Sequence, residues 1–558
     1  MSVLNLNEDM KEIKLDGLDL DALRILILQL MNKIEALTAL TKAQAEIIQQ
    51  QRDEIARLKG EQPKPNIRPQ AKEKPKNISS EKERKNPRIQ RKKKPSKNAD
   101  VKIDRTEICP VDKKILPDDA VFYGYQNVSV QNIIFKTDNI LFKREVYYSP
   151  SLHKTFSGKV PAGFEGQYGP DLKTFVILFH HQHKMTESSI LAALTNAGIK
   201  ISSATISRIL TDNNEHFYEE KDDIVQAGTE KSEVNQMDDT SGRFRGLNVV
   251  VHVLCSLLFT AYFTRDRKDR LTILEIISQG KLSFSFDEFA YTLMDQLNVA
   301  DKHIKRLRAL YPMGKVMRRE EVDALLLSLF PDPATHTKIR QSILEGSAIS
   351  WYQKQPNAIK ILMADDAPQF KLITKLLALC WIHDGRHYKK LNPYFGQHIL
   401  ALDAFLKEYW EYYHELLAYK KACNGTPAPV KAKELSEKFD ILFSKTTGYD
   451  DLDKRIAMTK AKKKELLMCL EYPNAPLHNN CSELGARKQA FYRDGSYHTM
   501  SEKGTLSKDA FMTLSETCKK LGVNFYHYLL DRITKSYQMP SLADIIHNKS
   551  YPLTSSMH

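Results

Sequence analysis

The chain has 558 residues, with 83 Lys or Arg against 69 Asp or Glu, and its formal net charge is +14. This length exceeds that of one ordinary domain, so we expect several modules. The positive excess favours a polyanionic partner, with nucleic acid as the first candidate, because basic side chains displace counterions from phosphates. The seven cysteines include no pair at Cys-x-x-Cys spacing, which argues against a disulfide framework and favours a reducing cytosol.

Neither a signal peptide nor a membrane span is expected. The N-terminus opens with acidic and amide residues rather than a basic and then an apolar region. The most apolar run, from Val251 to Phe263, is too short to cross a bilayer and predicts a buried strand. We therefore expect a cytoplasmic protein, associated with the nucleoid if it binds DNA.

A heptad pattern runs from Leu23 to Leu58. Eight of its eleven seam positions are apolar, whereas Thr41, Gln44 and Gln51 interrupt the middle. The spacing predicts a coiled-coil helix through which the chain forms a homo-oligomer. The alternative is an amphipathic helix that packs on its own protein.

A basic, proline-rich segment follows the heptads. Residues 61–100 contain 14 Lys or Arg and 5 Asp or Glu, and they lack apolar side chains to bury. Such a composition predicts an extended linker. The run Arg91, Lys92, Lys93 and Lys94 is a candidate for non-specific contact with DNA phosphates, although a solvated linker without a partner has the same composition.

Short β-rich stretches separated by turn residues occupy residues 101–175. Examples are Asn132 to Phe135 and Arg144 to Tyr148, and the segment contains Cys109-Pro110 near its start. They predict a small β-containing module. A zinc ribbon needs more thiolates than Cys109 supplies, so no zinc is expected there.

Residues 186–212 predict a helix-turn-helix. Gly198 breaks the pattern between two helices, and a serine near position 202 is placed to cap the second one. In this arrangement Ser203, Thr205 and Arg208 lie on the exposed face of the second helix, where DNA would bind. The inward-facing residues would be Ile201, Ile206 and Ile209, and the alternative is an αα-hairpin without DNA contact.

Carboxylates follow the apolar strands of the C-terminal half. Asp238-Asp239 ends one expected strand before a turn around Ser241-Gly242, and Asp365-Asp366 ends another, Ile359 to Ala364. A helical pattern lies between them at 271–278, and a further strand is expected from Leu379 to His383. Glu483 is expected on the first turn of a helix capped by an asparagine.

Three carboxylates that converge would suit phosphodiester chemistry. Two metal ions on one carboxylate site activate the nucleophile and stabilise the leaving oxygen. Oxygen ligands of this kind favour Mg²⁺ or Mn²⁺. The residues alone leave open that these aspartates are turn or capping residues.

Two segments resemble signatures of the insertion sequence 66 family of transposases, namely Leu379 to Leu391 and Leu477 to Arg487. Two more, Met237 to Arg243 and Met363 to Phe370, resemble the family's aspartate boxes. By this resemblance Asp238, Asp365 and Glu483 are the catalytic metal ligands of a DDE transposase. The resemblance covers nearly the whole chain, including the stretch from Tyr497 to Arg532.

The resemblance implies an RNase H-like catalytic domain that cuts element ends and joins them to target DNA without a covalent protein intermediate. Accessory proteins encoded by the same mobile element can be required. It also places five residues near the site as candidates for phosphate contact, ligand orientation or helix capping, although each has an ordinary structural alternative: His383, Arg386, Asn479, Asn480 and Arg487. The sequence departs from the family at His478 and Leu484, and apart from Cys109 it lacks the ribbon cysteines.

The resulting prediction is a multidomain α/β protein with an N-terminal coiled-coil helix, a zinc-ribbon-like β module, a helix-turn-helix and a mixed-sheet RNase H-like domain with helical insertions. Two alternatives share this layout: a non-catalytic DNA-binding protein and a structure-specific nuclease. The expected modules are a coiled-coil helix at 1–60, a basic linker at 61–105, a degenerate ribbon-like module at 106–175, a helix-turn-helix region at 176–230, a catalytic domain at 231–495 and a helical C-terminal region at 496–558.

Overall fold

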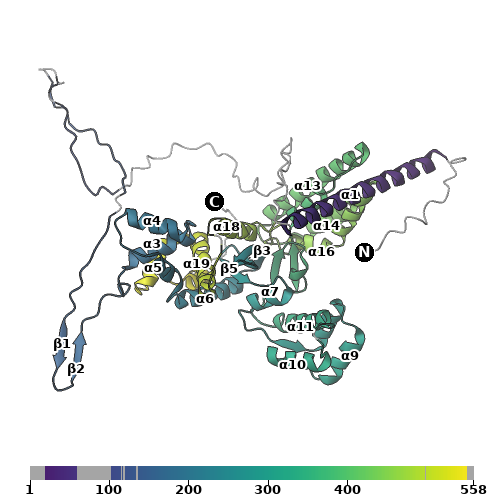
Figure 1. The fold of residues 1–558 in the computed structure, drawn as a ribbon. Helices are drawn as coiled ribbons and strands as arrows, with labels where there is room; N and C mark the ends of the chain where they lie inside the picture. The colour runs from purple at the N-terminus through teal and green to yellow at the C-terminus, as the bar shows by residue number, and fades with distance from the viewer. Residues whose placement is uncertain are drawn as a thin grey trace.

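A five-stranded mixed sheet lies at the centre of the computed structural model (Figure 1). The structure describes residues 19–58 and 102–549, apart from 113, 115, 117–119, 123, 134–135, 333 and 497. In spatial order the strands are β5 (Thr260–Arg265), β4 (Leu247–Cys255), β3 (Val234–Phe244), β8 (Ile361–Ala364) and β9 (Leu376–Leu379). The first three are antiparallel, and β8 and β9 run parallel to β3. The expected mixed α/β class is confirmed.

Two expected strand boundaries are wrong. β3 continues past Asp238 to Phe244, and the hairpin turn lies at Arg245-Gly246, where both residues have positive φ. A two-residue hairpin needs this left-handed backbone. Position 242, inside the strand, requires glycine because an added Cβ would lie 2.9 Å from the Val251 side chain. The apolar run from Val251 to Phe263 contributes to two strands, β4 and β5.

The second wrong boundary follows β9. That strand ends at Leu379, and residues 381–383, expected in the same strand, begin helix α12 (Trp381–Lys389) instead. The helix buries the Trp381 ring beside Tyr409, at a centroid distance of 5.5 Å, and its indole N–H donates to the Leu466 carbonyl at 2.8 Å. Burial of this large aromatic side chain outweighs the β propensity of the local sequence.

Helix α19 (Glu502–Leu521) covers the edge strand β5. The backbone N–H groups of Thr260, Tyr262 and Thr264 donate to side chains of Thr517, Thr513 and Asp509 at 3.3, 3.1 and 2.6 Å. Every second residue of the strand thus meets every fourth residue of the helix. This contact satisfies the strand's unpaired donors and prevents edge-to-edge association. Helices α6 (Glu215–Lys231), α7 (Arg270–Ile277) and α18 (Asn480–Ser496) complete the surroundings of the sheet.

The two expected helices of the helix-turn-helix are present. They are α4 (Glu187–Asn196) and α5 (Ser203–Thr211), and α3 (Pro170–His181) packs against both. Gly198 has φ +85°, and the Ser202 hydroxyl accepts the N–H of Thr205 at 3.3 Å. Ile206 is buried as expected, and Leu210, which was not expected, is buried beside it. Binding of DNA by this helix pair stays a prediction.

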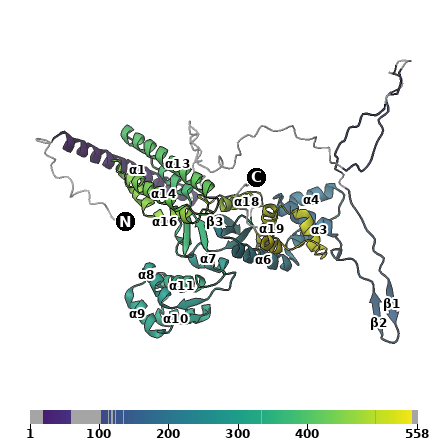
Figure 2. The ribbon, with the colours of Figure 1, turned by 180° about the vertical axis from the view of Figure 1, so that it is seen from behind.

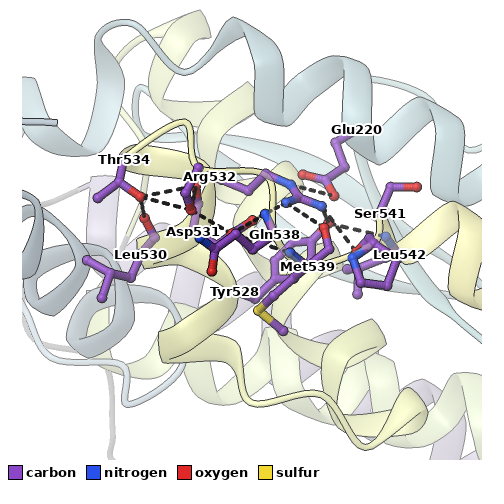
Figure 3. Close-up of polar contacts among 12 residues, drawn as sticks. Glu220, Tyr528, Leu530, Asp531, Arg532, Thr534, Gln538, Met539, Ser541 and Leu542 are labelled. Carbon is purple, nitrogen blue, oxygen red and sulfur yellow. Dashed lines mark hydrogen bonds and ion pairs between the residues drawn. The ribbon is translucent and has the colours of Figure 1, made fainter. Parts of the chain in front are cut away.

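A buried arginine ties the C-terminal helices to the rest of the fold (Figure 3). The helices are α20 (Phe525–Ile533) and α21 (Leu542–Asn548). Arg532 donates to the Tyr528 hydroxyl at 2.9 Å and to the Met539 carbonyl at 3.2 Å, and it pairs with Asp531. Its Nε lies 3.7 Å from Glu220 on α6. Burial raises the pKa of Glu220 to about 7, and the charge of Arg532 opposes that rise.

Residues 281–355 form a helical lobe next to α7 (Figures 1 and 2). It also contains a two-stranded sheet that the sequence did not indicate, with β6 pairing β7 in antiparallel fashion. The elements are β6 (Phe284–Phe286), α8 (Glu288–Gln296), α9 (Asp301–Leu310), β7 (Lys315–Met317), α10 (Arg319–Leu329) and α11 (Thr337–Tyr352).

A second helical insertion lies between β9 and α18. After α12 it comprises α13 (Gly396–Cys423), α14 (Pro429–Leu442), α15 (Asp450–Lys460), α16 (Lys463–Leu466) and α17 (Met468–Glu471). A short 3₁₀ turn, η2 (Pro368–Phe370), separates β8 from β9. The insertion has its own apolar core, which includes Trp381, Tyr409, Phe439 and Phe443.

Residues 102–169 contribute one exposed hairpin that projects from the fold (Figures 1 and 2). Its strands are β1 (Val146–Ser149) and β2 (Lys154–Ser157). Of the stretch from Asn132 to Phe135, the first two residues are not in a strand, and the last two lie outside the described residues. The core clusters contain no described residue of this segment, so the β module is reduced to this hairpin.

The heptad region forms one helix, α1 (Leu20–Leu58), beside α13 and α14 (Figure 1). The hydrogen bonds that hold α1 against the rest of the fold come from polar residues and not from the heptad seam. Glu35 Oε1 accepts the N–H groups of Tyr394 and Phe395 at 2.7 and 3.1 Å, and Oε2 lies 3.1 Å from His398 Nδ1. Asn32 donates to the Gly448 carbonyl at 3.1 Å. Seam residues that remain exposed are Ile27, Leu30, Ile34, Leu37, Ile48, Ile55 and Leu58.

We expect Glu35→Ala to release the docked end of α1. The substitution removes two hydrogen bonds to a charged acceptor, which together contribute about 2 kcal/mol or more, so the Tyr394 and Phe395 amides should exchange roughly 30-fold faster. Hydrogen exchange with mass spectrometry measures the effect. Glu46→Ala, at an exposed position of the same helix, is the control. Equal exchange in the two variants would contradict the docking role of Glu35.

Candidate active site

Asp238 lies within β3, and Asp365 directly follows the last residue of the neighbouring parallel strand β8. The last registered pair between β3 and β8 is Gln236 with Met363, and the two aspartates are each two residues further along. Since side chains alternate along a strand, Asp238 points to the same face of the sheet as Gln236, and the register brings the end of β8, which Asp365 follows, next to it. The like charge of Asp365 contributes to raising the pKa of Asp238.

Glu483 reaches the same place because the start of α18 is fastened to β3. The Asn479 amide donates to the Met237 carbonyl at 2.9 Å, and the N–H of Cys481 donates to the Gln236 side chain at 3.2 Å. Asn479 is fully buried and precedes the first residue of the helix. Glu483 is therefore on the first turn, as expected, and its charge also acts on Asp238.

The second aspartate of each pair is neutralised by lysine. Asp239 lies 2.6 Å from Lys268 Nζ, and Asp366 pairs with Lys371 at 2.9 Å and with Lys462. Within the described part of the chain, neither Asp238 nor Asp365 has an ion pair with Lys or Arg. The lysines that pair with Asp239 and Asp366 compete with a metal ion for these two carboxylates. Asp238 and Asp365, the first member of each pair, are therefore the carboxylates that can bind a cation.

Burial raises the pKa of Asp238 to about 7. The like charges of Asp365, Asp239 and Glu483 add to this rise, while the N–H of Asp239, which donates to Asp238 Oδ1 at 2.8 Å, opposes it. Repulsion of this kind stores electrostatic free energy that a bound divalent cation would relieve. Asp238, Asp365 and Glu483 thus have the donor atoms and the charge to hold Mg²⁺ or Mn²⁺.

His383 and Arg386 lie on α12 and face Glu483. His383 Nδ1 is 3.7 Å from Glu483 Oε1, Arg386 Nη2 is 3.5 Å from Oε2, and Arg386 Nη1 donates to His383 Nε2 at 3.2 Å. Burial lowers the pKa of His383, and the charge of Glu483 opposes this. His383 is on the first turn of a helix rather than at a strand end, so the sequence placed it in the wrong element.

The remaining expected residues lie in three places. Asn479 holds the N-cap position, but its amide binds β3 instead of capping the helix. Asn480 begins α18, and Arg487 is exposed one turn beyond Glu483. On α5, Ser203 and Arg208 are exposed and Thr205 is half-buried, far along the chain from the carboxylates. The basic run from Arg91 to Lys94 lies outside the described residues.

Sequence reasoning missed Cys380 and the three lysines. Cys380 is the N-cap of α12, one turn before His383, and its sulfur accepts the N–H of Asn479 at 3.3 Å. The Cys-x-x-His spacing would have been a usable signal if residues 381–383 had been predicted as helix. Lys268, Lys371 and Lys462 gave no local signal.

A close approach of α18 to β4 depends on Gly485. An added Cβ would lie 2.6 Å from the Val253 side chain, and the Gly485 carbonyl accepts the Tyr262 hydroxyl at 3.2 Å. We expect Gly485→Ala to push α18 away and to lower the free energy of unfolding by about 1–3 kcal/mol. Thermal unfolding measures this. Gly396→Ala, where no atom lies within 4 Å of the new Cβ, is the control, and equal melting temperatures in the two variants would contradict the packing role.

Comparison with known proteins gives one relative and no family. No protein-family model matches the sequence. The chain is similar to "Uncharacterized protein y4jO" of Sinorhizobium fredii (strain NBRC 101917 / NGR234), with 28% identity over 316 residues that cover 56% of this chain and 94% of y4jO. The name of y4jO does not state an activity. Among the described helices, none combines the length and the apolar composition that crossing a bilayer requires.

Proposed function

We propose that this protein is a DNA transposase that cuts the ends of an insertion element and joins them to target DNA in a metal-dependent reaction. The observation that carries the proposal is the asymmetry of the carboxylates. Among the described residues, Asp238 and Asp365 form no ion pair with Lys or Arg, whereas Asp239 and Asp366 are each paired with lysine. A mixed sheet that bears these carboxylates is compatible with the RNase H-like fold that the family resemblance implies.

The three carboxylates fit Mg²⁺ because they supply hard oxygen ligands in a half-buried site of concentrated negative charge. When bound, such ions activate the attacking hydroxyl or water and stabilise the leaving oxygen. The protein's own contribution is positional. β3 and β8 fix the two aspartates, and the hydrogen bonds of Asn479 and Cys481 to β3 fix the first turn of α18.

Cationic residues around this site suit a polyanionic substrate. Arg386 is more than one-third exposed, so its guanidinium can leave Glu483 and contact a phosphate. The exposed face of α5, with Ser203 and Arg208, is the proposed reader of DNA sequence. The basic linker and the exposed seam of α1 are the proposed elements for non-specific DNA contact and for homo-oligomer formation.

A cleavage and joining assay tests the function. The DNA substrate is taken from the inverted repeats that are expected to flank the gene, and its products are followed in Mg²⁺. We expect free 3′-hydroxyl ends and then strands joined to target DNA. Cleavage without joining would replace the proposal with a structure-specific nuclease. Specific binding without either product would replace it with a non-catalytic DNA-binding protein.

Mg²⁺ affinity should depend on pH through Asp238. The carboxyl holds a proton below its pKa of about 7, and that proton must leave before a cation binds, so the affinity should fall up to about tenfold for each pH unit below 7 and level off above it. Calorimetric titration with Mg²⁺ on either side of pH 7 measures the slope. Asp238→Asn should bind more weakly at every pH and show a flatter slope. An equally steep slope in that variant would assign the proton to another group.

A further inference from the structure

A second group of ligand atoms lies on the α12 side of Glu483. Among the residues that the structure describes, Cys380, His383 and Glu483 are the group of three metal-ligand types whose atoms all lie within 4.8 Å of one another. Cys380 and His383 are one turn apart at the start of α12, and Glu483 comes from the first turn of α18. None of these three side chains takes part in the ion pairs that lysines form with Asp239 and Asp366.

The chemistry of this group differs from that of the aspartates. One thiolate, one imidazole and one carboxylate form a donor set that favours Zn²⁺ over Mg²⁺, because zinc prefers sulfur and nitrogen ligands. Ligand atoms around a tetrahedral zinc ion are about 3.5 Å apart, given metal–ligand bonds of about 2.0–2.3 Å. His383 Nδ1 and Glu483 Oε1 already lie 3.7 Å apart. Closing the group onto a cation therefore requires side-chain shifts of only about 1 Å.

We propose that Cys380, His383 and Glu483 bind a thiophilic divalent cation of the zinc class, and that its binding removes Glu483 from the Asp238–Asp365 site. Three protein ligands leave a fourth coordination position open. The Cys380 group is separate from the ribbon-like segment at Cys109, where no zinc is expected. The second part of the proposal, an inhibitory effect of zinc, rests on the proposed function, whereas the binding itself does not.

The geometry supports competition for Glu483. Its carboxylate is the one acidic ligand of the Cys380 group and is also the third ligand of the aspartate site. Among the described residues, His383 Nδ1 has no hydrogen-bond partner, and it lies 3.7 Å from Glu483 Oε1. A narrow pocket is bordered by Cys380 and His383.

Arg386 opposes the cation in two ways. Its guanidinium lies 3.5 Å from Glu483 and carries like charge. It also donates to His383 Nε2 at 3.2 Å, so in the neutral ring the proton lies on Nδ1, the atom that must bind the metal. The cation must therefore displace Arg386 and release the Nδ1 proton together with the thiol proton. Because Arg386 is more than one-third exposed, it can move away without disturbing the core.

Co²⁺ absorption of the full-length protein tests the binding. We expect a thiolate-to-cobalt charge-transfer band that Zn²⁺ abolishes by displacing the cobalt. Cys380→Ser keeps a hydrogen-bond acceptor for Asn479 but should lose the band, and zinc affinity should fall at least about 100-fold in it and in His383→Asn. Cys518→Ser, which changes a buried thiol on α19, is the matched control. A band that survives in Cys380→Ser, or that is absent from the wild-type protein, would overturn the site.

Two further measurements separate the parts of the proposal. Arg386→Gln removes the opposing charge, and we expect it to tighten zinc binding roughly three- to tenfold; unchanged or weaker binding would contradict the geometry. For the inhibitory part, cleavage in Mg²⁺ with and without Zn²⁺ is compared within each protein. Zinc should inhibit the wild type and spare Cys380→Ser. Equal inhibition in both would refute the competition, whereas a wild type without any cleavage refutes the proposed function and leaves the cobalt result intact.

Discussion

Asp238→Ala, Asp365→Ala and Glu483→Ala are each expected to lower Mg²⁺-dependent cleavage of terminal-repeat DNA at least about 1000-fold, because each removes metal-held stabilisation of several kcal/mol from the transition state. Binding of the same DNA should stay within about threefold of the wild type, since phosphate and base contacts come from other elements. Gel separation of cleaved strands and a binding titration measure the two quantities. Cleavage at the wild-type rate in any of the three variants would remove that residue from the site.

The chain supplies matched controls for this experiment. Asp239→Asn and Asp366→Asn make the same chemical change next to the proposed ligands, but they affect carboxylates that are paired with Lys268 and with Lys371 and Lys462. We expect these variants to retain most of the cleavage activity, while Asp238→Asn and Asp365→Asn do not. If the pattern were reversed, the ligands would be the second member of each pair.

Arg455→Met is expected to destabilise the second helical insertion by about 3–5 kcal/mol, since it leaves the buried carboxylate of Asp384 without its counterion. The side chains of Arg455 and Asp384 are 11% and 6% exposed. Asp384 also accepts hydrogen bonds from Thr459 at 3.0 Å and from Tyr409 at 3.2 Å, so it cannot turn to solvent without losing them. Urea unfolding followed by tryptophan fluorescence measures the loss, because Trp381 is buried in this insertion.

Two variants make this stability prediction specific. Lys454→Met changes the neighbouring residue, whose ion pair with Asp451 is exposed, and should alter stability by less than about 0.5 kcal/mol. Adding Asp384→Asn to Arg455→Met removes the uncompensated charge and should recover part of the loss. No recovery in the double variant would show that the arginine acts through packing on Tyr388, over whose ring it lies at 5.6 Å, rather than through charge.

This ion pair also connects stability to the candidate site. Asp384 lies on α12 between His383 and Arg386, so the pair fixes the helix that presents both residues to Glu483. Loss of Arg455 should therefore loosen the surroundings of Glu483 without touching the carboxylates. The insertion thus positions one side of the site, in addition to any contact that it makes with DNA.

Local patterns predicted much of the fold. The 3.5-residue period predicted α1. A break at Gly198 and a serine cap predicted α4 and α5, and apolar runs predicted β3, β4 and β8. The errors arose where tertiary packing overrides a local signal. Ser241-Gly242 has a composition typical of turns, yet it lies inside β3, where Gly242 packs against Val251. Residues 381–383 are helical because Trp381 is buried under α13.

The sequence by itself determined the basic composition and the order of the elements, because strand alternation, helix periodicity and capping act between residues a few positions apart. The three candidate carboxylates came from the resemblance of its segments to a transposase family. Only the tertiary structure decided which aspartate of each pair is left free, since Lys462 reaches Asp366 across 96 positions of the chain. It also placed Cys380 and His383 against Glu483 and docked α1 through Glu35. Such contacts depend on how distant elements pack, and packing leaves no local pattern in the chain.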